Sequence, residues 1–503
     1  MRKWFWGIGL GLIFLLGIGL RLYHLTDVPH GFFGDEAAIG YNAYTIFHSG
    51  VDEYGKHFPL FFQSFGDYKD PVQIYFTVPF IALFGLSEFA TRLPSVVWGI
   101  VTILGVYLVT TEIKKSRIAG LFGAFAAAVM PWLIHYNRAG FELNSYAALW
   151  TITVYCFLKA QNRKIFFYFC AFFLGLTLFS YQPAKLLVPL LLIGFFITYH
   201  HSILRHKIVV LQSSLLFLIF AIPMIVSFFD VAGIARFTAV SVFSGKLTSQ
   251  EIVGRVISNY FDQLSPAFFL TGEPTFITRH FIHGLLPLLP VTFPFLVIGL
   301  FYILLTIRKA SSQFLIWLLL LYPVAGAVVL EAPFTSRAVI GAPLFAVLIG
   351  IGVERAIHLG RHKIGKIAVG GAIAVLFMVN TVIFCQFYFT QYPLYSSDYW
   401  GWQYGAKSIM QYFLSHKSQY DDLAMAGDFN GAEIFLKFYD PTHTCTNCIT
   451  AKPNDIFDSK RKQLFALTPD DMEKDTSFVY HPVGEIFYPD NTKAFLLVTV
   501  QKK

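Results

Sequence analysis

Long apolar runs, separated by short polar loops, dominate the sequence up to about residue 388. Most approach the roughly 20 apolar residues that a helix needs to cross a bilayer, and none has a charged residue near its centre. The pattern predicts an all-α polytopic membrane domain over residues 1–388, with about eleven transmembrane helices. The predicted spans lie near residues 4–21, 93–111, 117–134, 145–160, 165–181, 184–199, 208–229, 286–307, 312–330, 337–355 and 367–388.

One further apolar run, residues 72–86, is short for a span, and the charges of the loops decide how it counts. Lys and Arg concentrate in cytoplasmic loops. With a cytoplasmic N-terminus and an interfacial or re-entrant helix at 72–86, every basic cluster faces the cytoplasm. Counting 72–86 as a span would place them all outside. The clusters are Lys114-Lys115-Ser116-Arg117, Arg163-Lys164, Arg205-His206-Lys207, Arg308-Lys309 and Arg361-His362-Lys363.

This topology leaves three large outer segments, at residues 22–92, 230–285 and 389–503. The last one is more polar and contains turn signals such as Tyr439-Asp440-Pro441. We predict that it forms a small extracytoplasmic α/β domain. Its expected strands are Leu423–Ala426, Phe478–Tyr480 and Ala494–Val500, and its expected helices are Gly405–Leu414 and Ala432–Phe438.

Composition agrees with a multi-pass protein of a cell membrane, since 55% of the residues are hydrophobic and only 14% are charged. The net charge of +8 comes with basic loops between apolar runs, and no nucleic-acid-binding module is visible. Membrane lipids are therefore expected partners and nucleic acids are not. The first apolar run lacks a convincing cleavage site, so we predict a retained helix rather than a signal peptide.

The five cysteines divide between the two predicted parts of the chain. Cys156, Cys170 and Cys385 lie in apolar spans and are expected to be small core residues. Cys445 and Cys448 form a CxxC in the outer domain. A zinc site there would need other ligands, so we expect a local disulfide or two free thiols.

The first outer segment holds the strongest candidates for chemistry, the adjacent acids Asp35 and Glu36. Charged residues close to lipid are costly and are usually functional. Desolvation and nearby charges tune the pKa of a carboxylate at a partly dry interface, which suits it to general-base catalysis. We therefore predict Asp35 and Glu36 as catalytic residues. Lys69 and Arg92 could pair with a phosphate headgroup in the same loop, although snorkelling would also explain them.

These residues and their surroundings resemble a known family. The first helix is followed by Gly34-Asp35-Glu36, then by Lys69 and Pro71 before a short apolar helix, and then by Gly85-Leu86-Ser87-Glu88-Phe89-Ala90-Thr91-Arg92-Leu93-Pro94-Ser95. This order resembles the membrane glycosyltransferases of the GT-C class, in particular protein O-mannosyltransferases and bacterial aminoarabinose lipid A transferases. In one departure from that pattern, Asp70 separates Lys69 from Pro71.

The resemblance implies transfer of a sugar from a polyprenyl-phosphate donor to a lipid, protein or cell-wall polymer acceptor at the outer face. It implies Asp35 as the base, and direct attack would invert the anomeric centre. The leaving phosphate needs positive charge or hydrogen-bond donors. Its candidate ligands are Lys69, Arg92, Arg138, Lys185 and Arg337.

A divalent metal is optional in this scheme, because basic side chains can neutralise the phosphate. The candidates for an acceptor or metal site are Asp67, Asp70, His280 and His283. Two other functions stay open. A transporter or flippase of lipid-linked sugars would be expected to show repeats and broken helices at the membrane midplane, whereas here the charges gather at one face. A non-catalytic assembly protein would leave Asp35 and Glu36 unexplained.

Overall fold

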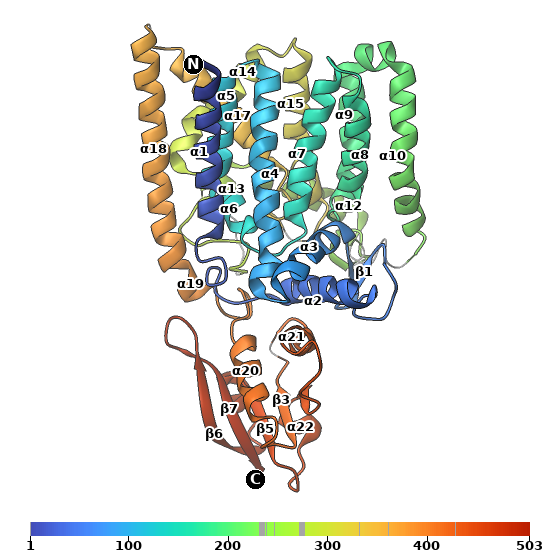
Figure 1. Ribbon diagram of the computed structural model, residues 1–503, viewed down its shortest axis with the longest axis vertical. Helices are drawn as coiled ribbons and strands as arrows, with labels where there is room; N and C mark the ends of the chain where they lie inside the picture. Colours follow the sequence, from blue (N-terminus) through green and yellow to red (C-terminus); the bar gives the residue numbers. More distant parts are fainter. Residues whose placement is uncertain are drawn as a thin grey trace.

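A computed structural model describes residues 2–230, 237, 239–245, 247–270, 277–330, 332–360, 362–427 and 429–503. Figure 1 shows a bundle of long, roughly parallel helices with a small sheet domain at one end, and the N-terminus at the other. The predicted combination of a mostly helical part with a small C-terminal α/β part is confirmed. Arg361 and parts of the predicted outer segment 230–285 lie outside the described residues.

Each apolar segment predicted to span the membrane contains a helix in the structure. The helices are α1 (Arg2–Leu22), α4 (Glu88–Lys114), α5 (Arg117–Val129), α7 (Leu143–Ala160), α8 (Phe166–Leu178), α9 (Ala184–Arg205), α10 (Lys207–Ser227), α14 (Phe293–Leu305), α15 (Ala310–Leu321), α17 (Gly341–Ile357) and α18 (Lys363–Thr390). Their lengths differ more than the hydrophobic pattern suggested. Among the described residues, five helices are long and apolar enough to cross a membrane by themselves, or six if a bent pair forms one span.

The bent pair is the clearest difference from the predicted spans. Residues 117–134 were predicted as one span, but α5 ends at Val129 and α6 (Pro131–Asn137) begins at an angle of 56° to it. Pro131 has no N–H to continue the α5 hydrogen bonds, and it stands at the first turn of α6, where proline is tolerated. The bend brings His135, Asn137 and Arg138 into the interior of the protein, where all three are buried.

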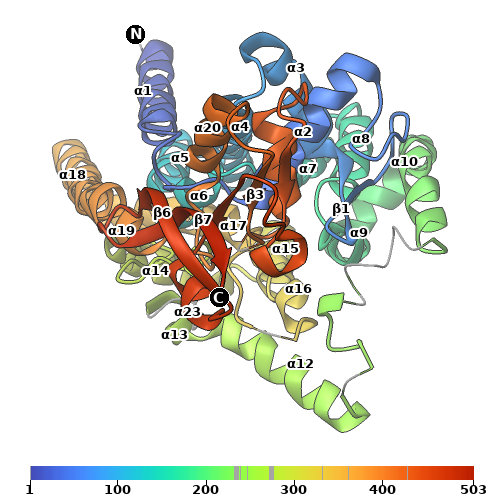
Figure 2. The ribbon, with the colours of Figure 1, turned by 90° about the horizontal axis from the view of Figure 1, so that it is seen from below.

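The first outer segment forms a layer across the ends of the long helices. It contains α2 (Gly34–Ser49), a hairpin of β1 (Phe62–Ser64) and β2 (Asp67–Lys69), and α3 (Pro71–Phe84). Figure 1 shows α2 lying crosswise between the bundle and the C-terminal domain. The second outer segment contributes α12 (Ser249–Leu264) and α13 (Pro266–Leu270), and Figure 2 shows α12 projecting from the side of the bundle. Short connections supply η1 (Pro290–Thr292), α16 (Val324–Ala327) and α19 (Tyr392–Tyr395).

The C-terminal domain is built on a five-stranded sheet with the strand order β4-β3-β5-β7-β6. β3 pairs in parallel with β4 and β5, whereas β7 is antiparallel to β5 and β6. The pattern of short apolar stretches predicted β3, β6, β7, α20 and α21, but missed β4 and β5. The bounds are β3 (Asp422–Met425), β4 (Cys448–Thr450), β5 (Gln463–Leu467), β6 (Phe478–Phe487), β7 (Lys493–Lys502), α20 (Ala406–His416), α21 (Ala432–Tyr439), α22 (Pro453–Ile456) and α23 (Pro469–Lys474).

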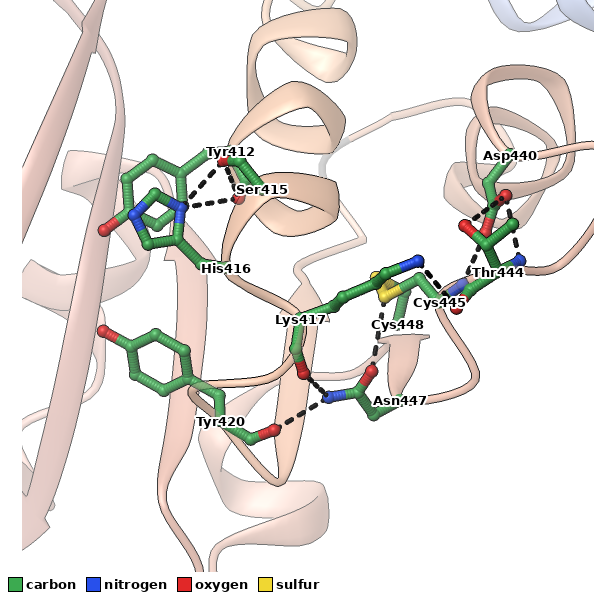
Figure 3. The surroundings of a disulfide bond; sticks show 10 residues. All are labelled: Tyr412, Ser415, His416, Lys417, Tyr420, Asp440, Thr444, Cys445, Asn447 and Cys448. Atoms are coloured by element: carbon green, nitrogen blue, oxygen red, sulfur yellow. Dashed lines mark hydrogen bonds between the residues drawn. A yellow bond between two sulfur atoms is a disulfide. The ribbon is translucent and has the colours of Figure 1, made fainter.

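A disulfide joins Cys445, in the loop between α21 and β4, to Cys448, the first residue of β4 (Figure 3). Asp440 fixes the start of this loop, because its carboxylate accepts a hydrogen bond from the Cys445 backbone N–H at 2.8 Å. Asn447 fixes its end by donating to the carbonyl oxygens of Lys417 and Tyr420 at 2.9 and 2.8 Å. Of the two states expected for Cys445 and Cys448, a local disulfide or two free thiols, the structure contains the disulfide.

Candidate functional site

The loop that leads to Asp35 is held by a fully buried ion pair between Arg92 and Glu36. The Nε and Nη2 atoms of Arg92 donate to the two carboxylate oxygens of Glu36 at 2.9 and 3.0 Å. Its remaining N–H groups donate to the carbonyl oxygens of Leu25, Pro29 and Gly31. All five guanidinium donors are therefore used inside the protein.

Both carboxylate oxygens of Glu36 likewise accept hydrogen bonds from groups inside the protein. Besides Arg92, its carboxylate accepts hydrogen bonds from the backbone N–H groups of Phe33 and Gly140 at 3.2 and 2.7 Å. The bond from Phe33 caps the first turn of α2, where an acidic side chain also interacts favourably with the helix dipole. Glu36 thus ties α2 to the start of α4 and to the turn after α6.

Arg138 supports the other side of the same loop. It is fully buried, and its five donors bind the backbone carbonyls of Leu20, Arg21, His24 and Val28, with two bonds to Val28. Its guanidinium also lies 4.9 Å from the centre of the Phe389 ring. Arg92 and Arg138 together fix the chain from Leu20 to Gly31, directly before α2.

Asp35 points away from Glu36, because neighbouring residues of a helix are about 100° apart around its axis. Its Oδ1 atom forms an ion pair with Lys69 Nζ at 2.7 Å. The two side chains are 36% and 12% exposed, respectively, so the pair is accessible from one side. Lys69 is the last residue of β2, whose pairing with β1 sets its position. The extra residue Asp70 therefore does not prevent Lys69 from reaching Asp35.

The Asp35–Lys69 pair lines a cavity of about 540 Å³, which we call the outer cavity. Its charged and polar wall contains Asp35, Asp67, Lys69, Glu142 and Arg279, together with Arg337 and His280. The cavity is also lined by apolar residues, which we call the apolar wall and which include Ala239, Val240, Ile277, Val329, Leu330 and Phe334. The cavity thus combines groups that suit an anion with a surface that suits an apolar chain.

Two arginines add positive charge to this cavity. Arg279 lies over the Phe33 ring, 4.1 Å from its centre, and donates to the backbone carbonyl of Trp400 at 3.1 Å. Burial lowers the pKa of Arg279, and the Asp35 carboxylate nearby opposes that shift. Arg337 donates to the Tyr181 hydroxyl at 2.7 Å.

A second group of charges lies behind Lys69. The Asp70 carboxylate is fully buried, and Lys185 Nζ lies 3.5 Å from its Oδ1 atom. The Asp70 backbone N–H donates to Glu142 Oε1 at 2.7 Å. Burial raises the pKa of Asp70, and it raises the pKa of Glu142 to about 8. Lys185 also donates to Gln182 Oε1 at 2.8 Å, so its ammonium group lies between the buried Asp70 and a residue that lines the outer cavity.

The fold and part of the sequence match known membrane glycosyltransferases. Residues 69–226 match the family model described as dolichyl-phosphate-mannose-protein mannosyltransferase. ArnT from Cupriavidus metallidurans, solved with bound undecaprenyl phosphate, shares 13% identity over 99% of this chain and 98% of that chain, with a TM-score of 0.61. The chain has the GT-C fold.

A second neighbour of the same fold is the oligosaccharyltransferase of Archaeoglobus fulgidus. Its apo structure shares 13% identity over 98% of this chain and 74% of that chain, with a TM-score of 0.54. A search among curated proteins finds no match. The predicted resemblance to the GT-C class is confirmed, and the matched family range begins at Lys69, after Asp35 and Glu36.

Within this GT-C fold, the predicted phosphate ligands separate into two groups. Lys69 and Arg337 line the outer cavity. Arg92 and Arg138 do not, because both are fully buried and have every donor engaged by the protein. Lys185 is only 7% exposed and is directed toward Asp70. In this geometry Arg92, Arg138 and Lys185 hold the loops, and contact of these three residues with a donor phosphate stays a prediction.

The acidic and histidine candidates also separate. Asp67 and His280 line the outer cavity, whereas Asp70 is buried behind it and His283 is exposed outside it. Within the described ranges, no group of three or more His, Cys, Asp or Glu side chains could hold a metal ion. Glu36 is a buried anchor of α2 in this structure, and its catalytic role stays a prediction.

Sequence reasoning missed Arg279 and Glu142 as members of the site. Arg279 stands next to His280, but nothing in the local pattern shows that the loop before α14 folds over Asp35. Glu142 follows the α5–α6 bend, so its position depends on a feature that the prediction of one span at 117–134 did not contain. Both residues are acidic or basic side chains at the outer end of a predicted span, which was the available signal.

Arg92→Met should destabilise the protein by about 3–5 kcal/mol, because it leaves the Glu36 carboxylate buried without its partner. The double variant Arg92→Met with Glu36→Gln should recover part of this loss, while the carbonyls that Arg92 binds remain unpaired. Unfolding of the detergent-purified proteins measures the effect. Arg163→Met, at an exposed arginine, is the control. Equal stability of Arg92→Met and this control would contradict the proposed anchor.

Glu142→Gln should raise the melting temperature at pH 8 but not at pH 4. The folded-state pKa of Glu142 is raised from 4.5 to about 8, so the native protein keeps a proton that the unfolded chain releases. Wild-type stability therefore falls as the pH rises through this window, and the glutamine variant lacks this loss. Thermal melts across the window provide the measurement, with the exposed Glu473→Gln as a control. A difference in melting temperature between wild type and Glu142→Gln that stays the same from pH 4 to pH 8 would contradict this prediction.

Proposed function

We propose that this protein is a membrane glycosyltransferase that takes a sugar from a polyprenyl-phosphate donor and passes it to a hydroxyl acceptor at the outer face. The observation that carries the proposal is the Asp35–Lys69 pair in a cavity that also contains Arg279 and Arg337. A carboxylate for the acceptor and cations for the phosphate thus occupy one space. The family match and the GT-C fold support this assignment.

The reaction follows from these charges. Asp35 accepts the proton of the acceptor hydroxyl as its oxygen attacks the anomeric carbon of the sugar. The bond from that carbon to the phosphate oxygen breaks, and polyprenyl phosphate leaves with the electron pair. A single displacement of this kind inverts the anomeric centre. Lys69, Arg279 and Arg337 supply the positive charge that a departing phosphate requires.

The apolar wall suits the remainder of such a donor. Ala239, Val240, Val329 and Leu330 could contact an isoprenoid chain next to the phosphate, while the cations contact its head. A transporter of lipid-linked sugars is less well supported, because the charges of the outer cavity come from loops at one end of the helices and not from their midpoints.

Asp35→Asn should reduce turnover by at least about 10²-fold while folding and donor binding persist, since the amide cannot accept the proton. Turnover is measured with short-chain prenyl phosphates carrying radiolabelled hexoses or pentoses. A thermal melt confirms that the variant is folded. Near-normal turnover by folded Asp35→Asn protein would remove the base from this mechanism.

Lys69→Met should weaken binding of the same prenyl-phosphate sugars, because it removes one of the cations that we propose to bind their phosphate. Lys56, an exposed lysine of the same outer segment, provides the matched Lys56→Met control. Titration of tryptophan fluorescence compares the variants. Equal donor affinity of both variants would place the phosphate elsewhere.

We further propose a cytoplasmic N-terminus and an extracytoplasmic C-terminal domain, as the basic loops predict. A cysteine introduced at the exposed Ser459 should react with an impermeant maleimide in intact cells. A cysteine at Lys164, in a basic loop, should react only after permeabilisation. The reverse pattern would invert the topology and place the outer cavity in the cytoplasm.

A further inference from the structure

One residue of the C-terminal domain lines the outer cavity among the described residues, and it lies next to the proposed base. Asn430 is in the turn between β3 and α21. A Cβ atom at Gly34 would lie 2.2 Å from the carbonyl oxygen of Asn430. Position 34, immediately before Asp35, therefore requires glycine to admit this turn.

The turn is held firmly in that place. The Asn430 backbone N–H donates to Gln403 Oε1 at 3.2 Å. Gly431 has a φ of +73°, and a Cβ there would lie 2.0 Å from the Phe65 ring. The turn is thus wedged between the first residue of α2 and the β1–β2 hairpin that positions Lys69. Because its backbone makes these contacts, the carboxamide is what Asn430 can offer to a ligand.

The whole domain is docked on α2, the helix that bears Asp35. Ala37, Ala38 and Tyr41 on one face of α2 belong to the same apolar core as Phe435 and Phe438 of α21. Ion pairs surround this contact, with Lys437 Nζ 3.3 Å from Glu53 and Lys407 Nζ 3.3 Å from Glu88. The Tyr439 hydroxyl donates to Glu88 at 2.7 Å. Such a contact makes the domain a fixed wall of the cavity.

The residues around Asn430 suit a polyhydroxylated ligand. Ser64 and Asp67 provide hydrogen-bonding groups, and the Phe65 and Tyr68 rings provide flat apolar surfaces. A carboxamide can donate and accept at once, which matches neighbouring hydroxyl groups. These four residues belong to the β1–β2 hairpin, against which the turn with Asn430 and Gly431 packs. The apolar wall comes from other segments, at residues 239–240, 277 and 329–334. A cavity of about 540 Å³ has the size of sites that enclose a small ligand.

We propose that the C-terminal domain forms the acceptor side of the outer cavity, where Asn430 binds a saccharide acceptor and directs its hydroxyl toward Asp35. This inference rests on the proposed glycosyl transfer. Donor binding depends on Lys69 and its neighbouring cations, so Asn430 should affect acceptor use and leave donor binding unchanged. The two substrates thus meet at α2 from different parts of the chain.

The test compares Asn430→Ala and the isosteric Asn430→Asp with wild type and with Asn454→Ala as the control. Asn454 is exposed on α22, further from the bundle than α21 in Figure 1. The donor probes are the radiolabelled short-chain prenyl-phosphate sugars, and the acceptor is membrane material from cells of the source organism that lack this protein. Transfer of label is measured against acceptor amount, and hydrolysis is measured without acceptor.

The expected result for both Asn430 variants is a rise of about tenfold or more in the apparent KM for acceptor, with label found on saccharide. Hydrolysis and donor affinity should stay within about twofold of wild type, since no contact of Lys69 changes. Asn454→Ala should match wild type in all assays. Unchanged acceptor KM, an equal loss of hydrolysis, or label on protein side chains would overturn the inference. Failure of wild type to transfer or hydrolyse any probe would instead refute the proposed function, and this inference with it.

Discussion

The buried pair of Arg92 and Glu36 is the interaction on which the rest of the site depends. A carboxylate and a guanidinium without solvent exposure are tolerated only if almost every donor and acceptor is satisfied. Here all five N–H groups of Arg92 are used, and Glu36 accepts two further backbone N–H groups. The pair therefore holds the start of α2, the loop before it, α4 and the turn after α6 in one arrangement.

Charged residues that are adjacent in the sequence therefore differ in their surroundings, with one buried and the other lining the outer cavity. Glu36 and Asp35 are adjacent in the sequence, but the helix turns one toward the interior and the other toward the outer cavity. Lys69 and Asp70 divide in the same manner, with Lys69 on Asp35 and Asp70 beside Lys185. In both cases a buried charge fixes the backbone, and the neighbouring charge is left to line the outer cavity. Replacing Glu36 or Asp70 would therefore shift Asp35 or Lys69, although the substitution itself is at the neighbouring position.

The C-terminal domain belongs to this arrangement and is not a separate attachment. Its α21 packs on the face of α2 opposite to the bundle, and its Asn430 reaches the residue before Asp35. The proposed base is thus placed by contacts from two sides. A change in the docking of the domain would alter the geometry at Asp35 as well as the wall that we assign to the acceptor.

The sequence by itself predicted the mostly helical part with its apolar helices, the small C-terminal α/β part and Asp35 as the leading candidate for chemistry. These follow from local properties, since hydrophobic length predicts helices and an acid near lipid is conspicuous. Lys69 and Arg337 could be selected in the same way, because they are cations at the outer ends of apolar runs. The same criterion, a cation at the outer end of an apolar run, also selected Arg92 and Arg138, although both are fully buried in the structure.

Only the tertiary structure decided which charges face the cavity. Arg92 and Lys69 look alike in the sequence, and they differ because backbone carbonyls far away in the chain surround one of them. Glu142 joins the site through the bend after α5, and Arg279 through the loop before α14. Asn430 joins it through the docking of the C-terminal domain. Such contacts join residues that are more than a hundred positions apart. Local hydrophobicity and charge do not predict these long-range contacts, because the burial of a side chain depends on how the whole chain packs.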